Sequence, residues 1–228
     1  TLSLHDALPI FSVHLNARAE MILGETAAQG VRLSDGSTIE GDLVLLSIGV
    51  LPNSKLAQDC GLALGLKGGI IVDQRMRTSD PAIWACGDCV EMTHILSKKA
   101  CYIPMGTTAN KQGRIAGSDI VGEQVAFKGV LGSQVTKVFE LYLAATGLTL
   151  EQAKAAGFDA VSSSIEKNDL ASYYPGGGVN KITLVLDKAD GRLLGANGIG
   201  TASIAGRMNV LVAAITMGQK NMLDPEQK

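Results

Sequence analysis

The chain has 228 residues, which is long for one domain and sufficient for two. Of these residues, 46% are hydrophobic and 18% are charged, a composition typical of a globular α/β protein. A formal net charge of −2 gives no electrostatic reason to expect nucleic acid or an anionic membrane as a partner. No apolar run reaches the roughly 18 residues that a membrane-spanning helix needs. We therefore expect a cytoplasmic protein.

The opening ten residues, TLSLHDALPI, resemble one translated reading frame of a widely used short-read sequencing adapter. Foreign segments of this kind are left out of fold reasoning. We expect residues 1–10 to be an artefact without a role, and the rest to be an internal fragment of a longer protein.

The chain from residue 11 to about 121 alternates short strands, turns and helices. Its most apolar run, DLVLLSI at residues 42–48, has the length of a buried parallel strand and ends at a Gly- and Pro-containing turn. The other elements predicted here are strands at residues 13–15, 20–23, 31–33, 69–72 and 84–86, a turn at residues 34–37, and helices at residues 56–60 and 108–121.

The pattern changes after residue 122, so we predict a domain boundary at residues 123–132. A hairpin is predicted because two alternating segments flank the turn-rich sequence DKADG. Thr149 is a candidate helix cap. The elements predicted in this half are β-structure at residues 136–145, a helix at 150–156, strands at 160–164, 181–186 and 192–199, and a helix at 202–218.

The four cysteines are Cys60, Cys86, Cys89 and Cys101. A chain with so large an apolar fraction needs no disulfides, and no secretory signal is evident, so we expect reduced thiols. The sequence C-G-D-C has the spacing of a redox pair, but small packing side chains are the favoured interpretation. The sequence shows no Cys/His cluster at ligand spacing, and no metal site is expected.

Residues 78–88, TSDPAIWACGD, place a short apolar segment directly before a Gly-Asp pair. Such a segment carries the chain to the carboxyl edge of a parallel sheet, where open α/β folds bind ligands. Gly87 has no Cβ, so its backbone can lie against a cofactor. Asp88 can accept hydrogen bonds from sugar-alcohol hydroxyls such as those of the ribityl chain of FAD. The eleven-residue pattern is far more specific than an isolated Gly-Asp pair.

Residues 103–114, IPMGTTANKQGR, place a helix start about twenty residues further on. A helix N-terminus offers unpaired N–H groups and a partial positive charge. Aimed at the flavin pyrimidine ring, it would stabilise reduced flavin by about 0.3–1 kcal/mol, or up to about 2 when partly buried. An ordinary capped surface helix is the alternative, which the neighbouring Gly-Asp pattern disfavours.

With these motifs the chain from Val13 onward resembles the C-terminal half of FAD-dependent pyridine nucleotide-disulfide oxidoreductases. It is similar to the group of coenzyme A-disulfide reductases, NADH oxidases and NADH peroxidases. The resemblance implies an α/β fold in three parts. They are the end of a Rossmann-like NAD(P)H-binding domain (residues 11–53), the C-terminal part of an FAD-binding domain (54–125) and an α+β dimerisation domain (126–228). FAD, NAD(P)H and a homodimer are implied with it.

The resemblance also assigns roles to residues. Gly49 lies near the nicotinamide side, Gly87 and Asp88 contact the FAD pyrophosphate and ribityl groups, and the helix start lies beneath the flavin. The residues of that helix start are Thr108, Ala109 and Asn110. The redox-active cysteine and the phosphate-binding glycine loops of the group belong to a segment that precedes this sequence, since no G-x-G-x-x-G follows a strand here.

Residues 172–176, SYYPG, resemble a Tyr-Tyr-Pro-Gly stretch of coenzyme A-disulfide reductases. In those enzymes a tyrosine of the dimerisation domain reaches the redox cysteine of the partner subunit. Tyr173 and Tyr174 are therefore candidate catalytic residues, because a phenol could hydrogen-bond a thiolate or a coenzyme A sulfur. An aromatic pair covering the edge of the dimerisation sheet is an equally weighted alternative. Arg207 is a weaker candidate for interface or coenzyme A contacts.

The first hypothesis is a homodimeric enzyme that passes hydride from NAD(P)H to FAD. Electrons then reach a cysteine and a disulfide substrate such as coenzyme A disulfide or a related low-molecular-weight persulfide. The second is an NADH oxidase or peroxidase that reduces oxygen or peroxide at a cysteine sulfenic acid. The third concerns the fragment alone, which we expect to be an inactive flavin-binding and dimerisation piece.

Overall fold

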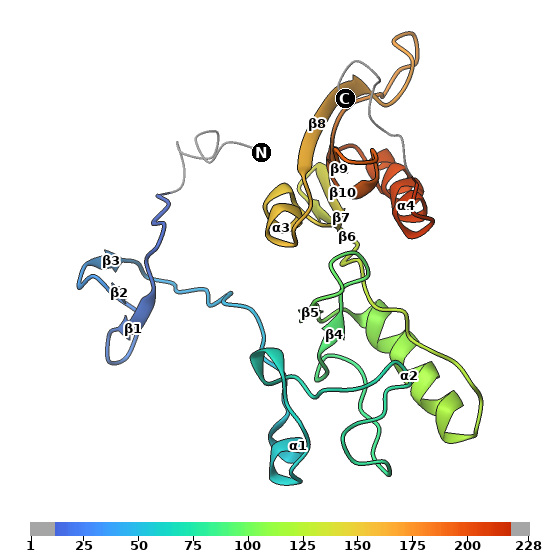
Figure 1. Cartoon of the computed structure of the whole chain (residues 1–228). Coiled ribbons are helices and arrows are strands. Elements are labelled where there is room, and N and C mark those ends of the chain that lie inside the picture. Colours follow the sequence, from blue (N-terminus) through green and yellow to red (C-terminus); the bar gives the residue numbers. More distant parts are fainter. Residues whose placement is uncertain (1–11, 220–228) are drawn as a thin grey trace. The chain divides into compact units, whose positions relative to one another are not determined.

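The computed structural model describes residues 12–219, so the adapter-like residues 1–10 lie outside the described part of the chain. The chain divides into two compact units, Thr1–Val50 and Leu51–Lys228 (Figure 1). Within residues 12–219, no helix is both long enough and apolar enough to cross a membrane.

The first unit contains a three-stranded antiparallel meander. Its strands are β1 (Ala19–Leu23), β2 (Gly30–Leu33) and β3 (Thr38–Glu40), with β2 in the middle. The predicted turn between β2 and β3 is confirmed: Oδ1 of Asp35 accepts hydrogen bonds from the backbone N–H (2.9 Å) and the hydroxyl (2.6 Å) of Ser37. β1 and β2 confirm two predicted strands, whereas β3 was not predicted.

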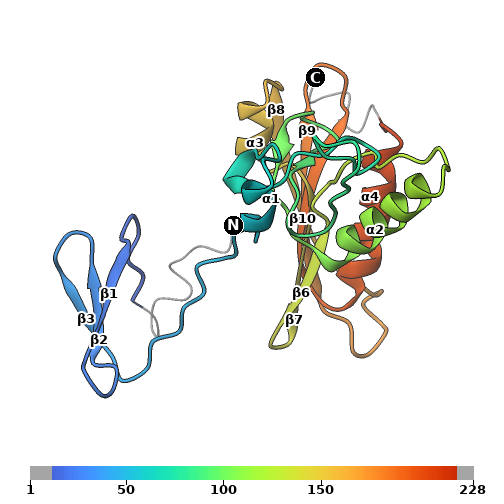
Figure 2. The ribbon, with the colours of Figure 1, turned by 90° about the horizontal axis from the view of Figure 1, so that it is seen from below.

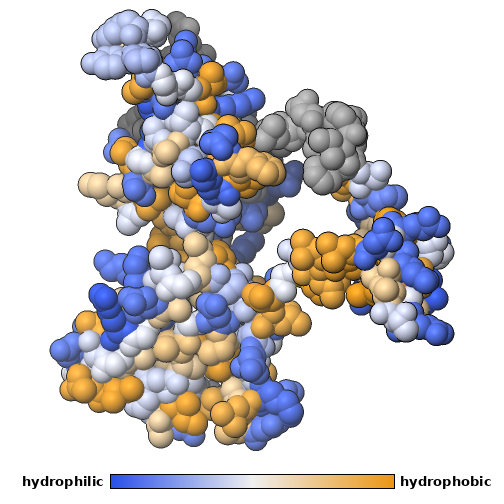
Figure 3. All heavy atoms as spheres, turned by 180° about the vertical axis from the view of Figure 1, so that it is seen from behind, coloured by the Kyte–Doolittle hydropathy of each residue, from blue (hydrophilic) through white to orange (hydrophobic). Residues whose placement is uncertain are grey.

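Two other strands predicted in this unit are wrong. Residues 13–15 and the apolar run at residues 42–48 have no regular secondary structure. Leu43, Leu45 and Ile48 are 88%, 86% and 87% exposed, and hydrophobic side chains lie open on the surface in Figure 3. A strand requires a hydrogen-bonded neighbour, and no described residue pairs with this run. The apolar sequence of residues 42–48 is therefore not sufficient to form a strand without a pairing partner.

The second unit begins with a small layer of helices and bridges. The helices α1 (Lys55–Asp59) and α2 (Gly106–Ile120) confirm the two predicted ones, and a short 3-10 helix lies between them at Leu66–Gly68. β4 (Met92–Thr93) and β5 (Ala100–Cys101) form a two-stranded antiparallel pair. The buried core of this layer consists of Ala57, Ile70, Val90, Met92 and Val130.

The strands predicted at residues 69–72 and 84–86 are wrong. Each segment forms isolated bridges only, centred on Ile70 and Trp84. The second segment is the apolar stretch before the Gly-Asp pair, and no parallel strand lies beside it within the described chain. Its sequence suits a buried strand, but the ladder that would define one is not formed.

The rest of the second unit is a five-stranded antiparallel sheet in the order β6-β7-β10-β9-β8 (Figure 2). β9 and β10 form the predicted hairpin, and β7 and β8 confirm predicted strands. The strand bounds are β6 (Gln134–Val138), β7 (Leu141–Gly147), β8 (Ala160–Asn168), β9 (Val179–Asp187) and β10 (Leu193–Gly200).

Two predicted helices complete this sheet domain. α3 (Leu150–Ala155) begins with a capping box, in which Thr149 Oγ1 accepts from the Gln152 N–H (3.2 Å) and Gln152 Oε1 accepts from the Thr149 N–H (3.0 Å). α4 (Ser203–Thr216) packs against β7 and β10. The cluster that joins α4 to the sheet consists of Ala144, Ala196, Ile204 and Met208. The layout is α+β, as predicted for this half.

Candidate functional site

The Gly-Asp pair lies against the start of α2. Gly87 is buried with a φ of 86°, and its N–H donates to Oε1 of Gln112 at 2.8 Å. A Cβ built on Gly87 would lie 3.6 Å from the Cβ of Ala109, so the left-handed backbone, rather than crowding, requires glycine here. The structure thus brings together two motifs that lie about twenty residues apart in the sequence.

The other predicted residues of this site differ in exposure. Asp88 is exposed, and its carbonyl accepts a hydrogen bond from the Tyr102 hydroxyl at 2.8 Å. Thr108 is buried, Ala109 is half-buried and Asn110 is exposed. The Asp88 carboxylate makes no hydrogen bond within residues 12–219, so both of its oxygens are available to a ligand.

The N-terminus of α2 is uncapped. Met105 is the N-cap residue and makes no side-chain cap, and the first turn has no acidic residue. The N–H groups of Thr108 and Ala109 donate to the Met105 carbonyl, whereas those of Gly106 and Thr107 have no partner among the described residues. A fifteen-residue helix therefore presents two free donors and a partial positive charge next to the Gly-Asp turn.

Gln112 adds a third free donor that the sequence analysis did not identify. Its side chain is fully buried, and its Nε2 has no partner in the described part of the chain. The oxygen of the same amide is already bonded to Gly87, so the nitrogen can be satisfied only by an acceptor. A buried donor without a partner costs about 1–3 kcal/mol. The signal in the sequence is the spacing of four residues from Thr108, which places both side chains on one helix face.

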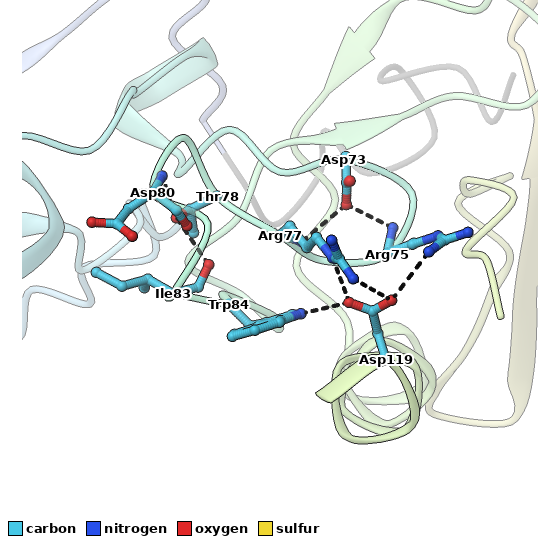
Figure 4. A network of polar contacts seen from close by, with 8 residues as sticks. All are labelled: Asp73, Arg75, Arg77, Thr78, Asp80, Ile83, Trp84 and Asp119. Atoms are coloured by element: carbon cyan, nitrogen blue, oxygen red, sulfur yellow. Dashed lines mark hydrogen bonds and ion pairs between the residues drawn. The ribbon is translucent and has the colours of Figure 1, made fainter. Parts of the chain in front are cut away.

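A buried carboxylate fixes α2 to the segment that leads to the Gly-Asp pair (Figure 4). The Asp119 side chain is 1% exposed and accepts from Arg77 Nε (2.6 Å), Arg77 Nη2 (3.1 Å) and Trp84 Nε1 (2.9 Å). Arg75 Nη1 lies 3.6 Å away. Asp73 Oδ1 accepts from the backbone N–H groups of both arginine residues and shapes their loop. The hydrogen bonds from Arg77 and then Trp84 lower the pKa of Asp119.

Two cysteines of this layer, Cys89 and Cys101, do not have the environment of reactive thiols. All four cysteines are free, and Cys89 Sγ donates a weak hydrogen bond to the Cys86 carbonyl at 3.4 Å. Burial raises the pKa of Cys89, and it raises the pKa of Cys101 to about 11. A reactive cysteine needs a lowered pKa. The structure favours the interpretation of the C-G-D-C cysteines as packing residues.

The remaining predicted site residues lie elsewhere. Gly49 belongs to the first unit, where it is exposed and has a φ of 84°. Tyr173 and Tyr174 lie on the loop between β8 and β9 and are 82% and 60% exposed, with ring centroids 5.1 Å apart. Neither phenol forms a hydrogen bond within the described chain. The tyrosines are therefore presented outward from the dimerisation sheet.

Comparison with known protein families gives two matches. The family model described as pyridine nucleotide-disulphide oxidoreductase matches residues 11–113, and the model of the dimerisation domain of the same family matches residues 133–224. The chain belongs to the pyridine nucleotide-disulphide oxidoreductase family. FAD and NAD(P)H are the cofactors of this oxidoreductase family, and the predicted recognition and fold class are confirmed.

Individual relatives agree with this assignment. The chain is 36% identical over 209 residues to an NAD(P)H sulfur oxidoreductase (CoA-dependent) of Pyrococcus furiosus, covering 90% of this chain and 47% of that protein. It is 34% identical over 203 residues to an NADH oxidase of Methanocaldococcus jannaschii, covering 89% and 45%. The structure of an NAD-dependent persulfide reductase from A. fulgidus superposes with a TM-score of 0.83 and 38% identity, covering 89% and 37%. The chain spans about half the length of these curated relatives.

The residues of the site fit FAD. Gly87 has a positive φ and no Cβ that would keep a ligand from its backbone, and three donor groups of α2 have no partner among the described residues. These donors are the two free N–H groups at the helix start and Nε2 of Gln112. FAD is rich in acceptors, because its pyrophosphate and its pyrimidine carbonyls both accept hydrogen bonds. An oxidoreductase of this family therefore has a donor set on this chain that suits its flavin.

The Asp119 network predicts acid sensitivity. Because its pKa is lowered from 3.8, the carboxylate stabilises the fold fully above pH 3.8, and this contribution is lost as pH falls through the lower folded-state value. Trp84 is the single tryptophan of the chain, so its fluorescence reports on the network. We expect acid to shift the emission of the wild-type chain below pH 3.8, and Asp119→Asn to shift it already at neutral pH. Asp59→Asn, at an exposed position, is the control. Superimposable profiles for all three proteins would contradict the role of Asp119.

The pKa of Cys101 predicts slow thiol chemistry. A thiol with a pKa of about 11 has roughly a hundredfold smaller thiolate fraction at pH 8 than one at the ordinary 9.0. We expect an aromatic disulfide reagent to modify the exposed Cys60 at least about tenfold faster than Cys101. Cys60→Ser should remove the fast phase, and Cys101→Ser should leave it unchanged. Equal rates at the two thiols would show that Cys101 is not shielded.

Proposed function

We propose that this chain is the flavin-contacting and dimer-forming half of a homodimeric flavoenzyme. It uses NAD(P)H to reduce a low-molecular-weight disulfide, with coenzyme A disulfide as the preferred substrate. The observation that carries the proposal is the exposed pair Tyr173 and Tyr174 on the loop between β8 and β9, within the sequence SYYPG. The similarity to a relative described as CoA-dependent supports the same substrate class.

The proposal assigns a role to each part of the chain. Residues 11–53 close the NAD(P)H-binding domain, with Gly49 on the nicotinamide side. Residues 54–125 belong to the FAD-binding domain, and residues 126–228 form the dimerisation domain. When bound, FAD would supply two-electron redox chemistry between NAD(P)H and a disulfide. The four free thiols suit a cytoplasmic protein.

The side chains around Gly87 act on FAD by binding and charge. The Gly87 backbone would hold the pyrophosphate, and the Asp88 carboxylate would accept hydrogen bonds from ribityl hydroxyls. The helix start from Thr108 to Asn110 would hold the flavin pyrimidine ring. There the helix terminus stabilises negative charge on the reduced flavin by about 0.3–1 kcal/mol, or up to about 2 where the site is partly buried.

A second copy of the chain completes the proposed enzyme. The sheet domain exposes apolar side chains on its edge strands and on the neighbouring strand, namely Val135, Val138, Leu141, Leu143 and Ile165. Exposed apolar surface of this kind marks an interface. In the dimer, Tyr173 and Tyr174 reach the redox cysteine of the other subunit, and a phenol donates a hydrogen bond to its thiolate or to the coenzyme A sulfur.

An NADH oxidase or peroxidase is the second candidate. It is supported by the similarity to a relative described as NADH oxidase, and it would use the same flavin site with oxygen or peroxide as acceptor. For this chain by itself we propose no turnover, because burial raises the pKa of the Cys89 and Cys101 thiols, whereas a redox-active thiol needs a lowered pKa.

The two candidate enzymes differ in their electron acceptor, which is a disulfide for the first and oxygen or peroxide for the second. We expect the full-length protein to oxidise NAD(P)H with coenzyme A disulfide under anaerobic conditions, and to form a mixed disulfide with coenzyme A that mass spectrometry detects. Tyr174→Phe should lower kcat/KM for the disulfide roughly 10- to 100-fold, since a hydrogen bond to a charged group is worth about 1.5–3 kcal/mol. Tyr142→Phe, within strand β7, is the matched control. Oxygen consumption without disulfide reduction would favour the oxidase.

Asp88 provides a separate test of the flavin site. Asp88→Ala removes a charged acceptor for ribityl hydroxyls, so we expect FAD to dissociate with a Kd roughly 10- to 100-fold higher. Flavin absorbance retained after dialysis of the full-length protein measures this. Asp159→Ala removes an exposed carboxylate of the sheet domain and should leave FAD content unchanged. Equal FAD retention in both variants would place the ribityl chain elsewhere.

A further inference from the structure

The loop that carries the two tyrosines is closed at its base by paired hydrogen bonds. Asp169 begins the loop after β8, and Gly178 ends it before β9. The Asp169 N–H donates to the Gly178 carbonyl at 2.9 Å, and the Gly178 N–H donates to Asp169 Oδ1 at 2.8 Å. The two ends of this ten-residue loop are thus joined by two hydrogen bonds, one donated by each end.

The second carboxylate oxygen of Asp169 fastens this base to the corner between β10 and α4. Oδ2 accepts hydrogen bonds from the hydroxyls of Thr201 (2.5 Å) and Ser203 (3.1 Å). Arg207, one turn further along α4, donates from Nη2 to the Asp169 carbonyl at 3.2 Å. A single aspartate therefore connects the base of the loop to a strand end and to a helix more than thirty residues away in sequence.

A buried asparagine makes the corner rigid. Asn180 Oδ1 accepts from the Thr201 N–H at 2.8 Å, and its Nδ2 donates to the Ser203 hydroxyl at 2.7 Å. A Cβ on Gly178 would lie 2.5 Å from Cγ2 of Thr201, so the two segments approach as closely as glycine permits. The hydrogen bonds from Thr201 and Gly178 lower the pKa of Asp169, and the carboxylate is therefore ionised at neutral pH.

The tip of the loop has much weaker support than its base. The Tyr174 N–H closes one turn by donating to the Ala171 carbonyl at 2.9 Å, and Gly176 adopts a φ of 80°. The rings of Tyr173 and Tyr174 contact each other at an interplanar angle of 39°, and both side chains are exposed. The place of the phenols relative to the sheet thus depends on how firmly the base is held.

We propose that Asp169 is a positioning residue for Tyr173 and Tyr174. Its carboxylate holds the loop against the β10–α4 corner, and the phenols then meet the partner's site in one orientation. This inference rests on the proposed role of the tyrosines in disulfide reduction. It assigns a role to a residue that touches neither substrate nor cofactor.

The test compares three variants of the full-length protein. Asp169→Ala removes the carboxylate, Thr201→Val removes one hydroxyl donor while keeping the side-chain shape, and Asp159→Ala is the control. Mass spectrometry should show amide hydrogen exchange at residues 169–178 at least tenfold faster in the first two and unchanged in the control. Should Asp169→Ala fail to fold, Thr201→Val carries the comparison alone.

Kinetics then separate positioning from mere stability. With coenzyme A disulfide, kcat should fall at least fivefold in Asp169→Ala and in Thr201→Val. The rate at which NAD(P)H reduces the flavin, followed by the loss of flavin absorbance, should stay unchanged. In a Tyr174→Phe background, Asp169→Ala should cause no further loss, because both changes act through the same phenol. A further loss in that background, or unchanged exchange, overturns the inference. If Tyr174→Phe itself has no effect, the proposed function fails, and exchange alone decides whether Asp169 holds the loop.

Discussion

The Asp119 carboxylate lies where two segments of the chain meet that no strand pairing joins. One is the loop from Arg75 to Trp84, which leads into the Gly-Asp pair, and the other is the end of α2. Three donors converge on a side chain that is 1% exposed, so the charge is both shielded from water and fully paired. Because the loop is anchored at the far end of α2, its continuation meets the near end of the same helix.

The geometry at that near end follows from this anchor. Gly87 turns back in the left-handed region, where its N–H is satisfied by Oε1 of Gln112, a side chain that is fully buried. The free donors at Gly106 and Thr107 then lie at the start of the same helix. The candidate flavin site of this chain thus combines hydrogen-bond donors of α2 with one exposed carboxylate, Asp88, which we propose as the acceptor for the sugar-alcohol chain.

Much of this could be predicted from the sequence where the signal is local. The helix start at IPMGTTANKQGR, the cap at Thr149 and the β9–β10 hairpin depend on residues within a few positions of each other, and all three are present. The strands predicted at residues 42–48 and 84–86 are wrong. A strand forms only beside a hydrogen-bonded neighbour, and its own sequence does not show whether that neighbour is present.

The polar residues that hold the site were missed for a related reason. Gln112 bonds a partner 25 positions away, Asp119 one 42 positions away, and Asp169 one 32 positions away. Nothing in a glutamine or an aspartate distinguishes such a role from that of an ordinary surface residue. Their functions appear only when the fold brings the distant partner into contact, whereas glycines and tyrosines in a compact motif are visible in the sequence itself.

The amide of Gln112 has one further consequence. A side-chain amide that can flip can present either its oxygen or its nitrogen to a partner. Here the Gly87 N–H binds Oε1 of Gln112, which fixes the orientation of the amide. The buried Nε2 end is therefore a donor that an oxygen or an unprotonated ring nitrogen could satisfy and that an ammonium could not. A neutral side chain thereby sets the hydrogen-bonding polarity of this buried position.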